Sequence, residues 1–343
     1  MDMTSAGSPP LRRAPTRRCV ITGLSTSAAT LAGCAPARPK ASGAIRMQLG
    51  WLKTVEFGGF WLADSRGYYR SHGLMPIWLS GGPSIAATPP LIAGGQADLG
   101  IDQFITVIDA VVQGCDMVAL GSVCQENPAG ILSLPKNPIT KAHDILGKRI
   151  GVMGSAKPII DALLQINGLP VDYTPVPVGF DPTPLIEEAC DGYVCFVTSQ
   201  PIMLKLKGIP YVTATYGQLG MPSYADTLYA DRSYIEANRP HLVNYLTATL
   251  RGWNDFLQAP RDAVELTLSR YGRDLDLNPV LETAYASEIV PFIAAKGTRL
   301  LSMSKELVAG PIYEFCRLTG RGNLPPVDRL VDLSLLEEAR ARL

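Results

Sequence analysis

Aromatic, carboxylate and amide side chains recur after short segments that are expected to form strands. Trp51 follows residues 46–49, where polar and apolar residues alternate, and Asp102 follows the short buried strand expected at residues 97–101. Aromatic rings can stack on a flat ligand, and carboxylates accept hydrogen bonds from amino or ring N–H groups. These residue types predict a site for a small, neutral or weakly basic heteroaromatic molecule. The predicted ligand-binding residues are Trp51, Glu56, Phe57, Asp102, Gln103, Gln125, Glu126, Tyr193, Thr198, Gln200, Tyr224 and Asp226.

Other binding chemistries lack their usual residues. No arginine stands at the ends of the apolar runs, whereas an anion such as a sulfonate or nitrate favours guanidinium groups and helix N-termini. The three histidines, His72, His143 and His241, are scattered, and no CxxC motif occurs. The glycine pair at residues 81–82 lacks the context of a nucleotide-binding loop. We therefore predict neither a metal ion nor a cofactor.

The elements that must position these residues alternate between strand and helix. Ligands of open α/β sheets bind beyond the carboxyl ends of the strands, which is where the polar and aromatic residues stand. A first alternating set ends near residue 134, a second begins at Asp144, and the sequence is mostly helical from Arg232 onward. The expected strands are 46–49, 75–80, 97–101, 117–122, 131–134, 146–152, 173–178, 192–197 and 211–214.

This alternation predicts an α/β protein with two doubly wound lobes joined by a two-strand hinge, with extra C-terminal helices. Residues 45–134 are expected to form the first part of lobe 1 and residues 135–222 to form lobe 2. Residues 223–343 are expected to return to lobe 1 and to add the C-terminal helices. Pro135, Pro138 and Pro222 would restrict the hinge to few conformations.

The N-terminal segment has the composition of an export signal. Arg17 and Arg18 resemble a twin-arginine motif, an apolar stretch of small residues follows, and residues 31–34 resemble a bacterial lipobox. Residues 1–33 are therefore predicted to be a signal peptide, and residues 34–44 a tether lipidated at Cys34. The protein is expected outside the cytoplasm, lipid-anchored at the outer face of the cytoplasmic membrane or in the periplasm.

The charge balance and the cysteine content bear on which partners and which disulfides the protein can have. The chain holds 31 Lys+Arg and 31 Asp+Glu without a long single-sign run, which argues against a nucleic-acid partner. Five cysteines would remain besides Cys19 and Cys34, so at least one stays unpaired, and most are expected to be buried small hydrophobes. The sequence leaves undecided whether disulfides link Cys115 to Cys124 or Cys190 to Cys195. We expect a monomer. The five are Cys115, Cys124, Cys190, Cys195 and Cys316.

Six segments together carry a family resemblance over residues 45–319. Their order and spacing resemble the solute-binding proteins of ABC importers, of the thiamine-pyrimidine-synthase-like and alkanesulfonate–nitrate-binding superfamily with the periplasmic-binding-protein type II fold. The resemblance implies two α/β lobes that close on one small molecule and then engage a permease and its ATPase. The segments are 50–51, 60–69, 73–74, 94–100, 146–148 and 193–201.

The same superfamily contains fungal enzymes that make the thiamine pyrimidine, hydroxymethylpyrimidine phosphate, from pyridoxal phosphate and one of their own histidines. The resemblance places Asp102 where those enzymes have their imine-forming lysine and Thr106 where they have the histidine. Residues 221–225 stand in place of their cysteine-rich run. A carboxylate cannot form an imine, so we expect a binding protein and not an enzyme.

The leading interpretation is thus an exported lipoprotein that captures a thiamine-pyrimidine-like precursor for an ABC importer. A first alternative keeps the fold and binds riboflavin, an aromatic sulfonate or another small metabolite. A second alternative is an enzyme of the pyrimidine-synthase type.

Overall fold

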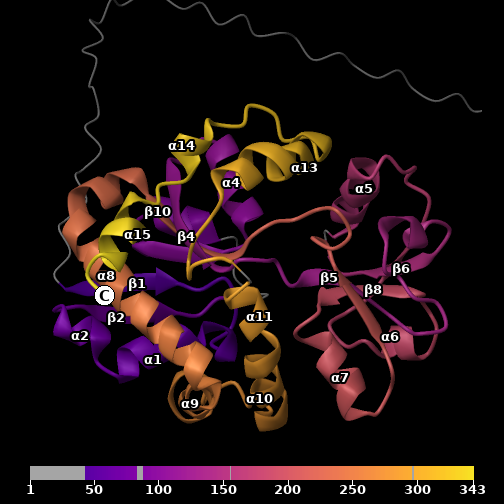
Figure 1. Cartoon of the computed structure of the whole chain (residues 1–343), viewed down its shortest axis with the longest axis horizontal. Coiled ribbons are helices and arrows are strands. Elements are labelled where there is room, and N and C mark those ends of the chain that lie inside the picture. The colour runs from indigo at the N-terminus through magenta and orange to yellow at the C-terminus, as the bar shows by residue number, and fades with distance from the viewer. Residues whose placement is uncertain (1–42, 83–87, 155, 296) are drawn as a thin grey trace, which may run out of the picture. The chain divides into compact units, whose positions relative to one another are not determined.

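A computed structural model of the chain describes residues 43–82, 88–154, 156–295 and 297–343 (Figure 1). The predicted signal peptide, Cys34 and residues 34–42 of the predicted tether lie outside these residues. The described residues form one compact unit. No helix within the described residues has the length and apolarity needed to cross a bilayer.

The first sheet contains strands from both ends of the chain. Its order is β2-β1-β3-β10-β4. Strand β1 pairs in parallel with β2 and β3, whereas β10 lies antiparallel between β3 and β4. The chain therefore returns to this sheet through β10. The strands are β1 (Ala44–Gln48), β2 (Met75–Leu79), β3 (Leu99–Asp102), β4 (Met117–Cys124) and β10 (Ala225–Asp231).

The second sheet has the order β7-β6-β8-β5-β9. Strand β5 is antiparallel to both β8 and β9, and β6 is parallel to β7 and β8. Because β5 pairs here, the chain leaves the first sheet at residues 125–128, earlier than the crossing expected after residue 134. The strands are β5 (Ala129–Ser133), β6 (Arg149–Val152), β7 (Thr174–Pro177), β8 (Gly192–Phe196) and β9 (Val212–Thr215).

Helices cover both sheets (Figure 1). Before β10 they are η1 (Val55–Phe57), α1 (Gly58–Ser65), α2 (Tyr68–Ser71), α3 (Thr88–Ala93), α4 (Phe104–Val112), η2 (Ala142–Ile145), α5 (Lys157–Ile166), α6 (Thr183–Ile186) and α7 (Gln200–Leu206). After β10 they are α8 (Arg232–Gln258), α9 (Pro260–Leu266), η3 (Thr267–Tyr271), α10 (Pro279–Glu288), α11 (Val290–Ile293), α12 (Lys305–Leu307), η4 (Val308–Ile312), α13 (Tyr313–Leu318), α14 (Val327–Leu330) and α15 (Ser334–Arg340). Two five-stranded sheets with these helices make the mixed α/β architecture that the alternation predicted.

Both faces of the first sheet are buried, as is typical of sheets with parallel strands. Successive residues of β10 point to opposite faces: Leu228 and Ala230 join one apolar core with helices α1 and α8, and Tyr229 joins another with α3 and α4. Burial along its whole length explains why β4 is an apolar run, whereas β1 alternates between buried and half-buried residues at its start.

Two glycines allow helix α1 to lie directly on helix α8. A Cβ atom on Gly59 would come within 2.2 Å of the Trp253 ring, and one on Gly252 would come within 2.1 Å of the Gly59 carbonyl oxygen. The backbones can approach this closely only because neither residue has a side chain. This packing holds the preceding turn, which carries Trp51 and Glu56.

The C-terminal helices contact elements of both sheets. Tyr313 and Phe315 of α13 share an apolar core with Leu163 of α5, which belongs to the second sheet's set of helices. Arg321, just after α13, pairs with Asp109 of α4 on the first sheet. The C-terminal segment therefore packs on both halves of the protein, in addition to the two crossing strands.

Candidate ligand-binding site

Three carboxyl side chains lie close enough to Glu56 to raise its pKa. We call Glu56, Asp102, Asp226 and Glu282 the carboxylate cluster. The first stands on η1, the next two at strand ends of β3 and β10, and the last on α10. Burial, followed by the charges of the other three, raises the pKa of Glu56 well above its usual range. Carboxyl groups with such environments are candidates for functional sites.

Asp226 has an unusual backbone conformation. Its φ is +53°, a region that residues with a side chain rarely adopt, and its side chain is 5% exposed. The Cys124 thiol donates to Asp226 Oδ2 at 3.4 Å, across the register that pairs Ala225 with Cys124. Strained backbone that is held by its surroundings occurs preferentially at ligand sites, so this conformation supports a functional role.

The carboxyl groups of Glu56 and Asp226 are hydrogen-bonded to each other. Burial raises the pKa of Asp226 to about 6, while the hydrogen bonds from Cys124 and Glu56 act to lower it. This hydrogen bond raises the pKa of Glu56 and lowers that of Asp226, which favours the proton on Glu56. The pair can therefore offer a donor and acceptors at once.

Helix α10 and strand β8 complete the surroundings of this pair. Glu282 accepts a hydrogen bond from the Val55 backbone N–H at 2.8 Å, which fixes η1 beside α10. Burial and then the charges of Glu56 and Asp226 raise the pKa of Tyr285 well above its usual range. The Thr198 hydroxyl is fully buried and is the hydrogen-bonding neighbour of that phenol.

Asp102 is held by its own turn. Its carboxylate accepts hydrogen bonds from Thr88 Oγ1 at 2.7 Å, from the Gln103 backbone N–H at 2.7 Å and from Thr106 Oγ1 at 3.3 Å. A Cβ atom on Gly50 would lie 3.5 Å from its Cγ, so the turn after β1 passes directly over it. Asp102 therefore contributes its charge to the carboxylate cluster, while its oxygens already accept hydrogen bonds from the protein.

The structure thus brings together Glu56, Asp102, Thr198 and Asp226 of the residues predicted from sequence. Trp51 is 39% exposed at the turn after β1, where its carbonyl accepts from the Gly81 N–H. Side chains that are already engaged elsewhere form a second group: Gln103 accepts from Asn127, Gln125 bonds to Ser122 and Ser302, Gln200 accepts from the Phe196 N–H, and Tyr224 accepts from the Ser304 N–H.

Two predicted aromatic residues lie within apolar cores. Phe57 is 1% exposed and packs edge-on against Trp61, and Tyr193 is fully buried with its hydroxyl donating to the Gly179 carbonyl at 2.5 Å. Their rings are used for packing within their own halves. Glu126, in contrast, is exposed after β4.

One member of the carboxylate cluster, Glu282, and two residues beside it, Tyr285 and Cys124, were not among the predicted residues. Glu282 and Tyr285 belong to α10, which follows the strand-end residues by more than 50 positions and carries no local signal of a site. Cys124 ends β4, and its neighbour in sequence, Gln125, was the predicted contact. All five cysteines within the described residues are free thiols.

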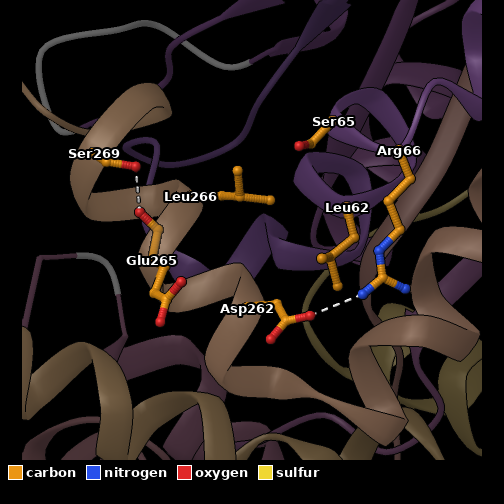
Figure 2. Close-up of a pocket in the computed structure, with 7 residues that line it drawn as sticks. All are labelled: Leu62, Ser65, Arg66, Asp262, Glu265, Leu266 and Ser269. Carbon is orange, nitrogen blue, oxygen red and sulfur yellow. Dashed lines mark hydrogen bonds and ion pairs between the residues drawn. The ribbon is translucent and has the colours of Figure 1, made fainter.

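Two surface hollows lie outside the carboxylate cluster. The first, about 260 Å³, is lined by α1 and α9, and its Arg66 pairs with Asp262 at 2.8 Å (Figure 2). The second, about 510 Å³, lies between α7 and α10, where Lys205 pairs with Glu288 at 2.9 Å. The second hollow marks where the second half of the protein faces α10, the helix that carries Glu282 and Tyr285.

Metal-ligand groups and the position assigned to an imine-forming lysine can both be checked among the described residues. No group of three or more His, Cys, Asp or Glu side chains suited to a metal ion occurs in the described part of the chain. The position that the resemblance assigns to an imine-forming lysine is Asp102, whose oxygens are hydrogen-bonded as described above.

Comparison with known proteins identifies the family. The model of a family described as "NMT1/THI5 like" matches residues 54–263. A 4-amino-5-hydroxymethyl-2-methylpyrimidine phosphate synthase from Legionella pneumophila is 26% identical over 230 residues, covering 65% of this chain and 72% of that protein. The Schizosaccharomyces pombe protein of the same name is 32% identical over 159 residues, which is 45% of each chain.

Solved structures show the same fold in binding proteins. The periplasmic aliphatic sulphonate binding protein SsuA from Escherichia coli superposes with a TM-score of 0.63 at 16% identity, covering 84% of this chain and 92% of that one. At such identity the likeness establishes the fold alone, which is that of the periplasmic solute-binding proteins of ABC importers. It thereby confirms the fold predicted from the sequence.

Proposed function

This chain belongs to the NMT1/THI5-like family, and from that premise we propose that it is the solute-binding component of an ABC importer. Its ligand is a small heteroaromatic molecule of the thiamine-pyrimidine type, captured by closure of two lobes. The proposal rests on one observation above all. Asp226 is a buried carboxyl with a strained backbone, and the groups that shift its pKa and that of Glu56 are acidic or neutral, so these two carboxyls match a neutral or weakly basic ligand with N–H donors.

In this proposal the two lobes close on the ligand, and closure is the signal for transport. The ligand shifts an open–closed equilibrium by as much as it prefers the closed form, and the importer's permease then engages that form. Thr198, after β8, lies beside Tyr285 of α10, so groups from both halves meet at the cluster. The Lys205–Glu288 ion pair adds a second contact between α7 and α10. Trp51, from the exposed turn after β1, is our proposed stacking residue.

A direct binding measurement tests this function. The purified protein is titrated with 4-amino-5-hydroxymethyl-2-methylpyrimidine while its tryptophan fluorescence is followed, with riboflavin and an aromatic sulfonate as competitors. Saturable binding of the pyrimidine that neither competitor displaces supports the proposal. Preferential binding of riboflavin or of the sulfonate would keep the binding role and replace the ligand.

A pyrimidine-synthase activity is the second candidate, because the curated relatives reported above carry that name. It requires an amine that forms an imine with pyridoxal phosphate, and the residue at the expected position is Asp102. Incubation with pyridoxal phosphate and iron distinguishes the two functions. An imine absorbance band or any pyrimidine product would establish the enzyme, and their absence together with pyrimidine binding would favour the importer component.

We further propose that the protein is exported and anchored by lipid at Cys34, facing the permease and ATPase of its importer. The arginine pair at 17–18 and the lipobox-like residues 31–34 support this. Metabolic labelling with a radioactive fatty acid should mark the wild type and leave Cys34→Ser unlabelled. Equal labelling of both would place the anchor elsewhere.

A further inference from the structure

Three arginine side chains of the first half of the protein carry charges that no acid neutralises. Arg70 belongs to α2, Arg251 to α8, and Arg342 follows α15. Arg70 and Arg342 are exposed and Arg251 is half-buried. The ion pairs among the described residues include none of the three. Asp255, one turn after Arg251 on α8, pairs instead with Arg66 at 2.5 Å.

Helix α2 packs on α8 through its two tyrosines, which places Arg70 and Arg251 on one surface. The Tyr69 ring stacks on the Tyr245 ring of α8, with 5.0 Å between the ring centroids. The Arg251 guanidinium lies 6.0 Å from the centroid of the Tyr68 ring. Arg70 stands in the same turn of α2 as Tyr68, so the two guanidinium groups belong to neighbouring positions.

Arg342 joins this surface from the C-terminal segment. Its Nη1 donates to Asn244 Oδ1 at 2.7 Å. Asn244 and Arg251 are separated by nearly two full turns of α8, so they share one face of that helix. We call Arg70, Arg251 and Arg342 the arginine surface.

The chain enters the fold beside the arginine surface. The Gly43 carbonyl accepts a hydrogen bond from the Met75 N–H at 2.7 Å, and a Cβ atom on Gly43 would lie 2.7 Å from the Gly73 carbonyl oxygen. Gly73 and Met75 lie just after α2, the helix of Arg70. Between the proposed lipid attachment at Cys34 and Gly43 stand eight residues, which span at most about 30 Å. The tether therefore keeps the arginine surface close to the membrane.

The composition around this entry point matches a negatively charged lipid surface. Residues 35–42 contain Arg38 and Lys40 and no acid, so that with the arginine surface five cations gather here. Clusters of roughly four to eight such residues beside a membrane anchor attract anionic lipids. The Met75 side chain, 60% exposed at the start of β2, adds an apolar group suited to the headgroup layer.

We propose that the arginine surface binds the anionic phospholipid headgroups of the membrane that carries the lipid anchor. This inference rests on the anchor proposed at Cys34 and adds a lipid-binding role for the folded domain. The guanidinium groups donate hydrogen bonds to the phosphate oxygens. Strands β1 and β2 begin at this surface, whereas Trp51 and Asp102 stand at the carboxyl ends of strands. Contact with lipid therefore leaves the candidate ligand site uncovered.

Hydrogen–deuterium exchange on vesicles tests the proposal. The full-length protein is purified from its native host and added to vesicles of phosphatidylcholine alone, or of phosphatidylcholine mixed with phosphatidylglycerol. Amide exchange in residues 68–75 is followed at about 0.1 M and about 0.5 M salt. The same host supplies a triple variant of the arginine surface, Arg70→Gln with Arg251→Gln and Arg342→Gln.

A second triple variant is the matched control, because it removes the same charge from other places. Its three arginines are exposed and form no ion pair within the described residues. They stand on α9, after η3 and on α13. The control combines Arg261→Gln, Arg273→Gln and Arg317→Gln.

We expect exchange in residues 68–75 of the wild type and the control to slow severalfold on the mixed vesicles and not on the neutral ones. The slowing should disappear at the higher salt concentration, which screens the charges. Each arginine contributes about fivefold to binding, so the surface variant should bind about 100-fold more weakly and lose the slowing. Arg70→Glu alone, at an exposed position, should bind about 25-fold more weakly, which keeps the test decisive if the triple variant misfolds.

Flotation with the neutral vesicles reports the anchor separately. A wild type that does not float on them would overturn the anchor, while slowed exchange on the mixed vesicles would still support the arginine surface. Equal exchange on both kinds of vesicle, or slowing that the surface variant retains, would overturn the inference and leave the anchor standing. Loss of the slowing in the control would show an attraction by total charge alone, and would overturn the inference as well.

Discussion

The buried charge of Asp226 should make this protein less stable at alkaline than at acidic pH. Its pKa is raised from 3.8 to about 6 by burial, which corresponds to roughly 3 kcal/mol of unfavourable free energy in the ionised form. A raised carboxyl pKa means that the folded state binds the proton more tightly. The penalty is therefore absent below pH 3.8, grows as pH rises through 6, and is complete above it. Between about pH 5 and 8 the penalty grows by roughly 1 kcal/mol.

Asp226→Asn removes this charge without changing the backbone requirement, because asparagine also tolerates a positive φ. Urea unfolding should show the variant gaining on the order of 1–3 kcal/mol relative to the wild type at about pH 8, and less at about pH 5. Asp276→Asn is the matched control, since Asp276 has a φ of +49° and is exposed. It should change little at either pH. An Asp226→Asn effect that is the same at both pH values, or no larger than the control, would refute the reasoning.

Three further perturbations follow from the structure. Trp51→Ala should weaken ligand binding by about tenfold or more with little loss of stability, because the ring is 39% exposed; unchanged affinity in a fluorescence-independent assay would move the site elsewhere. Gly59→Ala should destabilise by roughly 1–3 kcal/mol in urea because its Cβ would overlap a tryptophan ring, whereas Gly310→Ala, with no atom within 4 Å of its Cβ, should not; equal effects would contradict the packing. Glu288→Lys, opposite Lys205, should speed ligand dissociation severalfold in stopped flow, and an unaltered rate would show that this pair does not hold the lobes together.

The strand alternation predicted the architecture because it depends on local apolar runs. The crossing between the sheets was placed later than the structure has it, since residues 129–133 form a strand whose pairing partners β8 and β9 lie more than 50 residues ahead. Pairing over such distances is decided by the whole fold. No local pattern distinguishes a last strand of one sheet from a first strand of the other.

In the candidate site, too, some residues could be predicted from local sequence and others only from the tertiary structure. Asp102 ends β3, so strand-end reasoning reached it, and Asp226 was predicted from the segment that returns the chain to the first sheet, where it is the second residue of β10. Glu282 and Tyr285 reach the cluster only because α10 packs beside η1, which is a tertiary contact. Phe57 and Tyr193 also follow the expected pattern, but whether an aromatic ring faces a ligand or a core depends on side-chain burial, which sequence spacing does not encode.

The most direct test is mass spectrometry of the small molecule released when the protein is purified from its native host and denatured. Our account predicts a heteroaromatic molecule of the thiamine-pyrimidine type, in stoichiometric amount and identical to what the protein takes up when the same compound is added back. A sulfonate, another anion, or a compound that the protein has chemically converted would contradict the account.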